Sequence, residues 1–361
     1  MSRSSSTDIH AALAFFLPGQ AVAALTPLGQ GNINDTWKVR LADGRLLVLQ
    51  RLYPHVFPDM KAVMVNMRLL TAHLDRAVGS EPGLAFFRLI ATPDGQDHFL
   101  DAGCCWRLLT YLDRSRTLNS LTTSAQAEAI GGLLGAFHLL TADLDPDLLA
   151  DPLPEFHLTP RYLARYDAVC QHRALRGDRR ESLCREMIEH LRPTATLLEE
   201  ARDRLSRRVI HGDPKAANFL FAAGEDRAVS LIDFDTVKPG LVLHDLGDCL
   251  RSCCNREGEH RPDPEATVFD PDLFQGLMTG YLRRAAPLLT PADRGLLVAA
   301  AALISFELGL RFFTDHLEGN PYFKVSRPGE NLHRALVQLH LNRSIRSQQG
   351  ELERRLAALP A

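Results

Sequence analysis

The chain has 361 residues, of which 45% are hydrophobic and 24% charged, and its formal net charge is −3. This composition excludes intrinsic disorder, collagen and coiled coils, and the length suits one large domain or two smaller ones. The near-neutral charge predicts no basic surface for nucleic acid or anionic lipid. Only five of the 41 basic residues are lysine, so a lysine at a chemically informative position stands out.

The sequence predicts a cytoplasmic protein. Its first ten residues are polar and do not resemble a secretory signal. The most apolar run, 295–304, is shorter than the ~20 residues that span a bilayer, so we expect a buried helix there. Seven cysteines without a CxxC motif indicate a reducing compartment. His244, Cys249 and Cys253 have the residue types of a metal site, but the two cysteines also suit the buried stripe of a helix, which is the better interpretation.

Extended segments and turns alternate in the first part of the chain. Strands are expected over 22–28, 33–40 and 45–51, with up to three more between residues 86 and 112. A short helix is expected over 8–16 and a longer one over 59–74. The first ~110 residues therefore predict an antiparallel sheet that carries one long helix.

From about residue 114 the pattern is helical. Helices are expected over 124–140, 161–171, 179–191, 194–205, 271–285, 291–310, 329–341 and 350–359, and short strands over 208–210, 219–221 and 229–232. The chain thus predicts an α+β fold of two lobes, a β-rich N-lobe (1–113) and a helical C-lobe (114–361), joined by an extended crossing near Tyr111. Clefts between such lobes commonly bind ligands.

The strongest functional signal is His-x-Asp-x4-Asn, followed 15 residues later by an Asp at the end of a strand. Phosphoryl transfer needs a carboxylate that accepts the proton of the attacking hydroxyl, and oxygen ligands that hold Mg²⁺. Asp213 is the predicted base, Asn218 and Asp233 are the predicted metal ligands, and Lys215 would neutralise charge on the transferred phosphoryl group. A single Asp would be more simply explained as a loop or capping residue, but the ordered set favours catalysis.

Two further acids follow this motif. Asp235 is either a second metal ligand or a residue that shapes the turn, and the sequence favours neither. Asp245 lies in the first turn of an expected helix, where a carboxylate is stabilising, and we interpret it as a scaffold residue beneath the loop.

A glycine-containing turn precedes the second expected strand. Gly29, Gly31 and Asn32 on their own indicate only a hairpin. Placed ahead of the catalytic motif, such a turn can cover nucleotide phosphates with its backbone N–H groups.

These motifs resemble the aminoglycoside phosphotransferase and choline kinase superfamily, and most closely the bacterial N-acetylhexosamine 1-kinases within it. The similar segments are Gly-Gln-Gly-Asn-Ile-Asn-Asp-Thr-Trp (29–37), Phe-Pro-Asp (57–59), Ile-Asp-Phe-Asp-Thr-Val-Lys-Pro-Gly (232–240), Asp-Leu-Gly-Asp-Cys-Leu-Arg (245–251) and Arg-Phe-Phe-Thr-Asp-His-Leu-Glu-Gly-Asn-Pro-Tyr-Phe (311–323). The catalytic motif specifies only the superfamily, and the last segment indicates the sugar kinases.

The resemblance implies a protein-kinase-like fold, ATP and Mg²⁺ as cofactors, and phosphorylation of the anomeric hydroxyl of N-acetylglucosamine or N-acetylgalactosamine. It implies nucleotide contacts at Gly29, Gly31, Asn32, Gln50 and Tyr111, metal ligands at Asn218, Asp233 and Asp235, and sugar contacts at Asp213, Arg311, Tyr322 and Asn34. Without the resemblance, Arg311 would be a helix-end cation and Tyr322 a turn aromatic. The implied partner is a small-molecule sugar, with no nucleic acid and no membrane, and the protein is expected to be a monomer or a weak dimer.

The sequence departs from the wider kinase pattern at the nucleotide. The third strand has Gln50 where the wider kinase pattern has a lysine that binds the α- and β-phosphates. The next helix has Asn66 on the face where the wider kinase pattern has a glutamate that orients this lysine. Joint replacement by amides avoids a lone buried charge. Arg51 and Lys38 are the candidates to replace the lysine. The alternatives to a sugar 1-kinase are a kinase of the superfamily that acts on another sugar, choline or an aminoglycoside, and a nucleotide-binding scaffold without catalysis.

Overall fold

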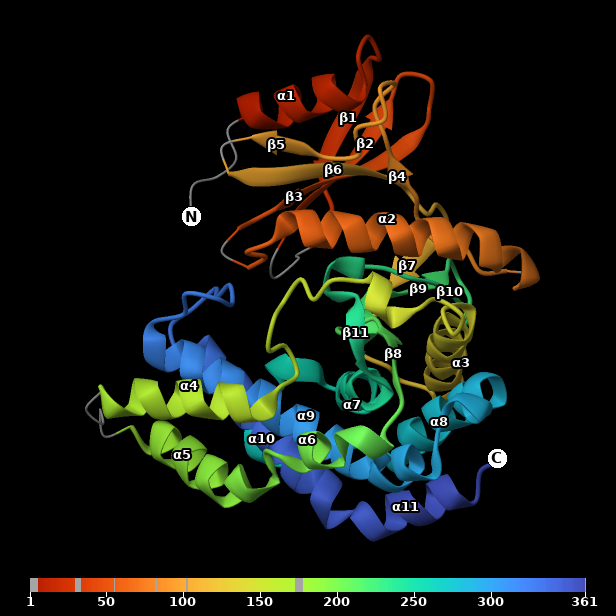
Figure 1. Ribbon diagram of the computed structural model, residues 1–361. Helices are drawn as coiled ribbons and strands as arrows, with labels where there is room; N and C mark the ends of the chain where they lie inside the picture. Colours follow the sequence, from red (N-terminus) through yellow and green to blue (C-terminus); the bar gives the residue numbers. More distant parts are fainter. Residues whose placement is uncertain are drawn as a thin grey trace.

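The computed structural model describes residues 6–29, 34–54, 56–81, 83–101, 103–172 and 178–360. It has a β-rich N-lobe and a larger helical C-lobe (Figure 1). The α+β class and the two-lobed layout predicted from the sequence are confirmed. The predicted nucleotide contacts Gly31 and Asn32 lie outside the described residues.

The N-lobe is built on an antiparallel sheet. Its strands are β1 (Val22–Pro27), β2 (Asp35–Leu41), β3 (Leu46–Leu52), β4 (Leu89–Ile90), β5 (Phe99–Asp101) and β6 (Cys104–Thr110), in the order β1-β2-β3-β6-β4 with β5 also paired to β6. Helix α1 (Ser6–Phe16) covers the outer face of the sheet, and α2 (Met60–Ala77) lies between the sheet and the C-lobe (Figure 1).

The two faces of this sheet have different neighbours, and this decides where each polar side chain points. Leu47 and Leu49 of β3 pack with α1, whereas Leu52 packs with α2. Because side chains alternate along a strand, Arg51 belongs to the outer face and Gln50 to the face directed at the C-lobe.

The C-lobe holds the remaining helices and two small sheets. The helices are α3 (Ser124–Leu140), α4 (Thr159–Gln171), α5 (Arg179–Leu191), α6 (Leu197–Ala201), α7 (Val242–Cys253), α8 (Pro271–Ala285), α9 (Pro291–Glu318), α10 (Glu330–Ser347) and α11 (Gln349–Ala357). Strands β7 (Ser115–Thr117), β9 (Phe219–Ala222) and β10 (Ala228–Leu231) form one sheet, and β8 (Arg207–Ile210) pairs with β11 (Lys238–Leu241). The lobe boundary at 113/114 stays a proposal.

Helix α9 runs through the core of the C-lobe, in contact with α4, α7 and α10. Thr290 and Asp293 form a capping box at its start. Its length and its mean hydropathy of 1.9 over an 18-residue window would allow it to cross a membrane, but 78% of that window is buried inside the protein. It is therefore the central helix of the lobe, as expected for the apolar run.

Some predicted boundaries are wrong. Helix α9 was expected to end at Leu310, yet it continues to Glu318 and ends at Gly319, whose φ is 93°. Phe312, Phe313 and Leu317 are buried, so packing carries the helix past the end of the apolar run. The helix expected over 194–205 is largely broken into single turns, and α-helix remains only at α6.

Candidate active site

The catalytic loop connects β8 to β9 and turns sharply at Gly212. The φ of Gly212 is 86°, and a Cβ at this position would lie 2.6 Å from the carbonyl oxygen of Thr236. Glycine is therefore required both by the backbone conformation and by the close approach of the next turn. This contact sets the catalytic loop against the Phe234–Thr236 turn.

Asp245 of α7 supports the loop from below. Its carboxylate accepts hydrogen bonds from the backbone N–H groups of His211 and Gly212, both at 2.7 Å, and contacts Nε2 of His138 at 2.9 Å. Burial opposes its charge, yet these bonds and the nearby histidines hold the pKa of Asp245 below its usual value. The predicted role of Asp245 as a scaffold residue is confirmed.

A second buried pair holds the loop from the α9 side. Nε2 of His157 lies 2.7 Å from the carbonyl oxygen of Gly212, and Nδ1 lies 3.0 Å from Oε1 of Glu307. Thr159 donates to the other Glu307 oxygen at 2.8 Å. Burial disfavours the charged imidazole, but Glu307 raises the pKa of His157 above its usual value. Since the Gly212 carbonyl only accepts, Nε2 carries a hydrogen.

His211 sets the direction of the base. Its Nε2 donates to the carbonyl oxygen of Ile232 at 2.9 Å, and its Nδ1 accepts from the backbone N–H of Asp213 at 3.2 Å. The first residue of the motif therefore links the catalytic loop to the strand end that carries Asp233.

The predicted base and its neighbours lie together. Nζ of Lys215 is ion-paired with the Asp213 carboxylate, and Nδ2 of Asn218 donates to the Asp213 carbonyl oxygen at 2.8 Å. The side chains of Asp213 and Lys215 are 26% and 32% exposed, so solutes can reach them. Burial alone would raise the pKa of Asp213, but Lys215 holds it below its usual value, and the carboxylate stays ionised.

Asp233 follows β10 in the left-handed region, with a φ of 71°. Aspartate tolerates this conformation better than most residues, and such strained positions concentrate at functional sites. Burial, and next the negative charge of Asp235, raise the pKa of Asp233 to about 7. A divalent cation beside this half-buried carboxylate would favour its ionised form.

The oxygens around Asp233 fit magnesium. The amide nitrogen of Asn218 donates to the carbonyl oxygen of Asp213, so its amide oxygen remains as an acceptor that could bind a cation. Carboxylate and amide oxygens suit Mg²⁺, whereas zinc sites use Cys and His. Within the described ranges, no cluster of three or more His, Cys, Asp or Glu side chains is placed to hold a metal ion.

Asp235 is engaged by the N-lobe. One carboxylate oxygen accepts from Nη1 of Arg107, and the other accepts from Nδ2 of Asn34 at 2.6 Å. The sequence left Asp235 open between a second metal ligand and a residue that shapes the turn, and the resemblance gave Asn34 as a sugar contact. The structure joins the two side chains to each other across the lobes. We therefore favour a structural role for Asp235 in this state.

Arg107 of β6 is a site residue that the sequence did not reveal. It lies opposite Gln50 in the β3–β6 register, and Gln50 Oε1 accepts from Nε at 2.8 Å and from Nη2 at 2.6 Å. Its side chain is 1% exposed. The only sequence signal was an arginine in the middle of the apolar segment Cys104–Thr110.

The two amides that depart from the wider kinase pattern do not pair with each other. Asn66 donates to the carbonyl oxygens of Ala150 and Val237 at 2.8 and 2.9 Å and accepts from the backbone N–H of Ala150 at 2.9 Å. Gln50 binds Arg107. The site therefore keeps a cation, Arg107, beside the strand position where the wider kinase pattern has a lysine.

The two cations suggested by the sequence are engaged elsewhere. Arg51 pairs with Asp35 at 2.8 Å on the outer side of the sheet, which contradicts a role at the phosphates. Nζ of Lys38 lies 4.1 Å from the ring centroid of Tyr111, the predicted nucleotide contact at the lobe crossing. Gly29 is exposed and left-handed, with a φ of 72°.

Arg311 lies within α9, so its interpretation as a helix-end cation is wrong. Four aromatic rings surround its guanidinium, with centroids at 5.0 to 5.8 Å, namely Phe156, Tyr162, Tyr322 and Phe323. In the part of the chain that the structure describes, Arg311 forms no hydrogen bond or ion pair. Burial opposes its charge, yet nearby phenol and carboxylate groups, Asp213 among them, raise its pKa.

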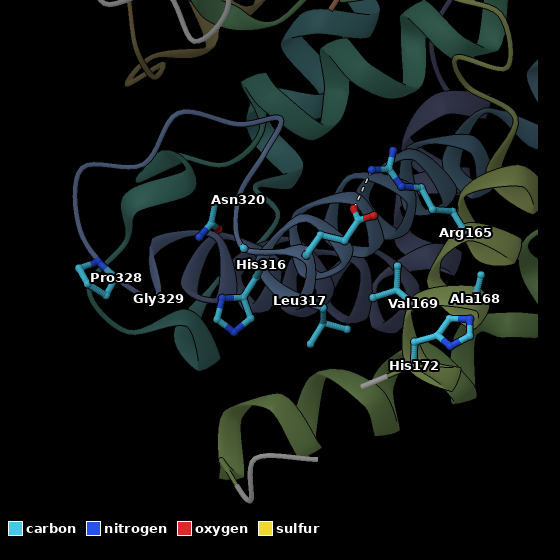
Figure 2. Close-up of a pocket in the computed structure, with 11 residues that line it drawn as sticks. Arg165, Ala168, Val169, His172, His316, Leu317, Asn320, Pro328 and Gly329 are labelled. Carbon is cyan, nitrogen blue, oxygen red and sulfur yellow. Dashed lines mark hydrogen bonds and ion pairs between the residues drawn. The ribbon is translucent and has the colours of Figure 1, made fainter. Parts of the chain in front are cut away.

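A cavity with a volume of about 840 Å³ lies away from these residues, between α4 and the end of α9. Figure 2 shows Arg165 of α4 and His316 and Asn320 at its wall, with the Arg165–Glu318 ion pair drawn as a dashed line. None of the residues predicted for the active site lines this cavity.

Comparison with known proteins gives one family and several similar folds. Residues 24–288 match the model of the phosphotransferase enzyme family. The fold is similar to an aminoglycoside phosphotransferase from Alicyclobacillus acidocaldarius, with 16% identity, a TM-score of 0.64 and 98% of each chain covered. It is also similar to a microcompartment-associated aminopropanol kinase, with 14% identity, a TM-score of 0.61, and 98% of this chain and 100% of that chain covered. An amicoumacin kinase in complex with AMP-PNP, Ca²⁺ and Ami matches with 14% identity, a TM-score of 0.58, and 99% of this chain and 96% of that chain covered. These likenesses establish the protein-kinase-like fold.

Proposed function

The chain belongs to the phosphotransferase enzyme family, and from that premise we propose that it is an ATP- and Mg²⁺-dependent kinase that phosphorylates the anomeric hydroxyl of an N-acetylhexosamine. That it is a small-molecule phosphotransferase with an alcohol acceptor follows from the family. The sugar, the position of phosphorylation and the metal are the proposal. The observation that carries it is the guanidinium of Arg311, which lies inside an aromatic cluster and has no ion-pair partner among the described residues. It is close enough to Asp213 for that carboxylate to help raise its pKa against the effect of burial.

Asp213 is the proposed base. It is ionised, held by Lys215 and directed by His211, so it can accept a hydrogen bond from the acceptor hydroxyl and take its proton as the bond to phosphorus forms. Anomeric hydroxyls are more acidic than ordinary alcohols, so a carboxylate with a lowered pKa suffices. We propose that Lys215, which is ion-paired with this base, offsets charge on the transferred group.

Asn218 and Asp233 are the proposed ligands of the metal, since they lie at the ends of the catalytic loop and of β10. Bound MgATP supplies the phosphoryl group and the cationic charge that stabilises its transfer. Gly29, Gln50 and Tyr111 are the described residues that we propose for the nucleotide.

The aromatic cluster around Arg311 supports a neutral polar acceptor. Aromatic rings can stack on the faces of a sugar, and the unpaired guanidinium can donate to hydroxyl or acetamido oxygens. We propose Arg311 and Tyr322 as the sugar contacts. A cationic acceptor such as choline or an aminoglycoside would be repelled by Arg311.

The acids near this cluster are already engaged, which further disfavours a cationic acceptor. Asp315 accepts from the backbone N–H groups of Tyr322 and Phe323 at 2.8 and 3.1 Å and from Nδ2 of Asn331 at 2.9 Å. Glu318 is paired with Arg165. These carboxylates shape the 320–323 turn and do not form an acidic cage.

An acceptor panel tests the proposal. ADP release would be measured with N-acetylglucosamine, N-acetylgalactosamine, glucose, choline, aminopropanol and kanamycin at equal concentrations, with and without Mg²⁺. We expect the two N-acetyl sugars to give the highest kcat/KM, and Mg²⁺ to be required. Preference for an amine would contradict the proposal, and no turnover with any acceptor would favour the non-catalytic scaffold.

The remaining expectations stay proposals. The seven cysteines are all free, which is consistent with a reducing cytoplasm. We propose that the protein acts as a monomer or a weak dimer without nucleic acid or membrane partners, which light scattering of the purified protein would check.

A further inference from the structure

The protein places one buried cation where the N-lobe sheet meets the Phe234–Thr236 turn, which follows the proposed metal ligand Asp233. Arg107 is 1% exposed, and its guanidinium reaches Gln50 on the neighbouring strand and Asp235 in the C-lobe. A buried arginine is costly unless its donors are satisfied by charged or polar groups. Three hydrogen bonds to acceptors in the two lobes therefore hold this side chain in one place.

The position of Arg107 follows from strand register. Gln50 and Arg107 are paired directly across β3 and β6, and paired residues point to the same face of a sheet. Their neighbours along the strands, Leu52 and Cys105, pack with α2, so this face is turned to the C-lobe. Arg51, one residue further along β3, points to the other face.

We propose that Arg107, held by Gln50, is the N-lobe cation that binds the phosphates of the nucleotide. Gln50 occupies the strand position where the wider kinase pattern has lysine, but its amide serves as the acceptor that fixes the guanidinium of Arg107. Arginine suits this role because its planar donors bind phosphate oxygens in pairs. The inference rests on the proposed ATP dependence and deepens it.

Arg107 also connects the proposed nucleotide region to the Phe234–Thr236 turn. Asp235 is its anionic partner and lies two residues beyond Asp233. Phosphate oxygens and the Asp235 carboxylate are both anionic acceptors, so we infer that they compete for the same guanidinium.

Lys38 of β2 is another cation on this face, and the structure favours Arg107 over it. Lys38 is paired with Val48 in the β2–β3 register and lies over the ring of Tyr111. Among the interactions of the described residues, none joins Lys38 to Asp233 or Asp235. Of the two, Arg107 contacts the Phe234–Thr236 turn, which directly follows Asp233.

Calorimetric titration of the full chain with AMP-PNP and with adenosine, both in Mg²⁺, tests the inference without turnover. Arg107→Met should weaken AMP-PNP binding by about 10- to 100-fold while adenosine affinity changes by less than about two-fold, because only the phosphates lose a charged partner. Arg107→Lys should recover part of the loss. Arg51→Met on the outer face is the matched control and should leave the ratio of the two affinities unchanged.

A loss of charge at a buried pair can also impair folding. The double variant Arg107→Met/Asp235→Asn leaves no unpaired carboxylate at this position. Its ratio of AMP-PNP affinity to adenosine affinity would be compared with the same ratio for Asp235→Asn alone. Equal changes for AMP-PNP and adenosine, or no change for either, would overturn the assignment of Arg107 while ATP dependence stands. A wild-type protein that binds no AMP-PNP would overturn the proposed nucleotide and this inference with it.

Discussion

The catalytic loop of the C-lobe and the inner face of the N-lobe sheet hold their polar groups in different ways. Asp213, Lys215 and Asn218 lie within one loop, and their spacing is visible in the sequence. Gln50 and Arg107 are 57 residues apart, and Arg107 and Asp235 are 128 apart, so the N-lobe network exists only after folding. A local motif can thus be recognised from its residues, whereas a network assembled by strand register cannot.

The supports beneath the two regions differ as well. Buried side chains of Asp245 and His157 bind the backbone of the catalytic loop directly, from α7 and from the α9 side. In the N-lobe, Asn66 connects α2 to the backbone of the C-lobe, at Ala150 and Val237. Changes in the first region should affect turnover most, and changes in the second should affect nucleotide affinity and lobe contact.

The largest effect is expected at the base. Asp213→Asn should lower kcat by about 10²- to 10⁴-fold, because the amide cannot take the hydroxyl proton. AMP-PNP affinity should stay within about three-fold of wild type, since the N-lobe network is untouched. Steady-state kinetics and calorimetric titration would measure the two quantities, and near-normal turnover would remove Asp213 from its role.

The next effect is expected at Gly212. Gly212→Ala should lower the free energy of unfolding by about 2–3 kcal/mol, because the residue is left-handed and its Cβ would clash with the Thr236 carbonyl. Gly224→Ala is the matched control, since Gly224 has a φ of 79° with no atom within 4 Å of an added Cβ. It should cost about 1 kcal/mol and leave kcat unchanged. If urea denaturation gave the same loss of unfolding free energy for Gly212→Ala and Gly224→Ala, the close packing of Gly212 against the Phe234–Thr236 turn would be contradicted.

A smaller effect is expected at Asn66. Asn66→Ala leaves the carbonyl of Val237 and the N–H of Ala150 without their side-chain partner, which should cost about 1–3 kcal/mol. Because these bonds connect the lobes, KM for ATP should rise more than kcat falls. A fall in kcat with an unchanged KM would show that Asn66 acts on the catalytic loop instead.

The smallest effect is a pH dependence at His157. Burial opposes the charged imidazole, but Glu307 raises the pKa of His157 above its usual value. The charged imidazole therefore stabilises the folded protein fully when the pH is below the pKa of the unfolded state, about 6.5. This stabilisation is lost as the pH rises through the pKa of the folded state. The free energy of unfolding of wild type minus that of His157→Gln should therefore be larger at about pH 6 than at about pH 9. Each unit of pKa difference is worth about 1.4 kcal/mol.

His190→Gln, at an exposed position of α5, is the control and should show the same difference at both pH values. A pH-independent difference for His157→Gln would indicate that the imidazole supports the Gly212 carbonyl as a neutral donor. The position of the catalytic loop would then depend on hydrogen bonding alone.

The sequence predicted the two lobes, the catalytic loop and the scaffold role of Asp245, because each depends on periodicity or on residues close in the chain. It missed Arg107, since a single arginine in an apolar strand gives no direction until register places it opposite Gln50. It also missed His157 and Glu307, which are 150 residues apart. Helix α9 was predicted too short because its last turns are stabilised by tertiary packing of Phe312 and Phe313 and not by a continuous apolar run.

The most direct test of the proposed activity is ³¹P NMR of the product formed from ATP and N-acetylglucosamine. The account predicts a sugar phosphate whose phosphorus couples to the anomeric proton, and no product from the 1-O-methyl glycoside, whose anomeric oxygen is blocked. A phosphate on any other hydroxyl, or equal turnover of the methyl glycoside, would contradict the assignment of this protein as a sugar 1-kinase.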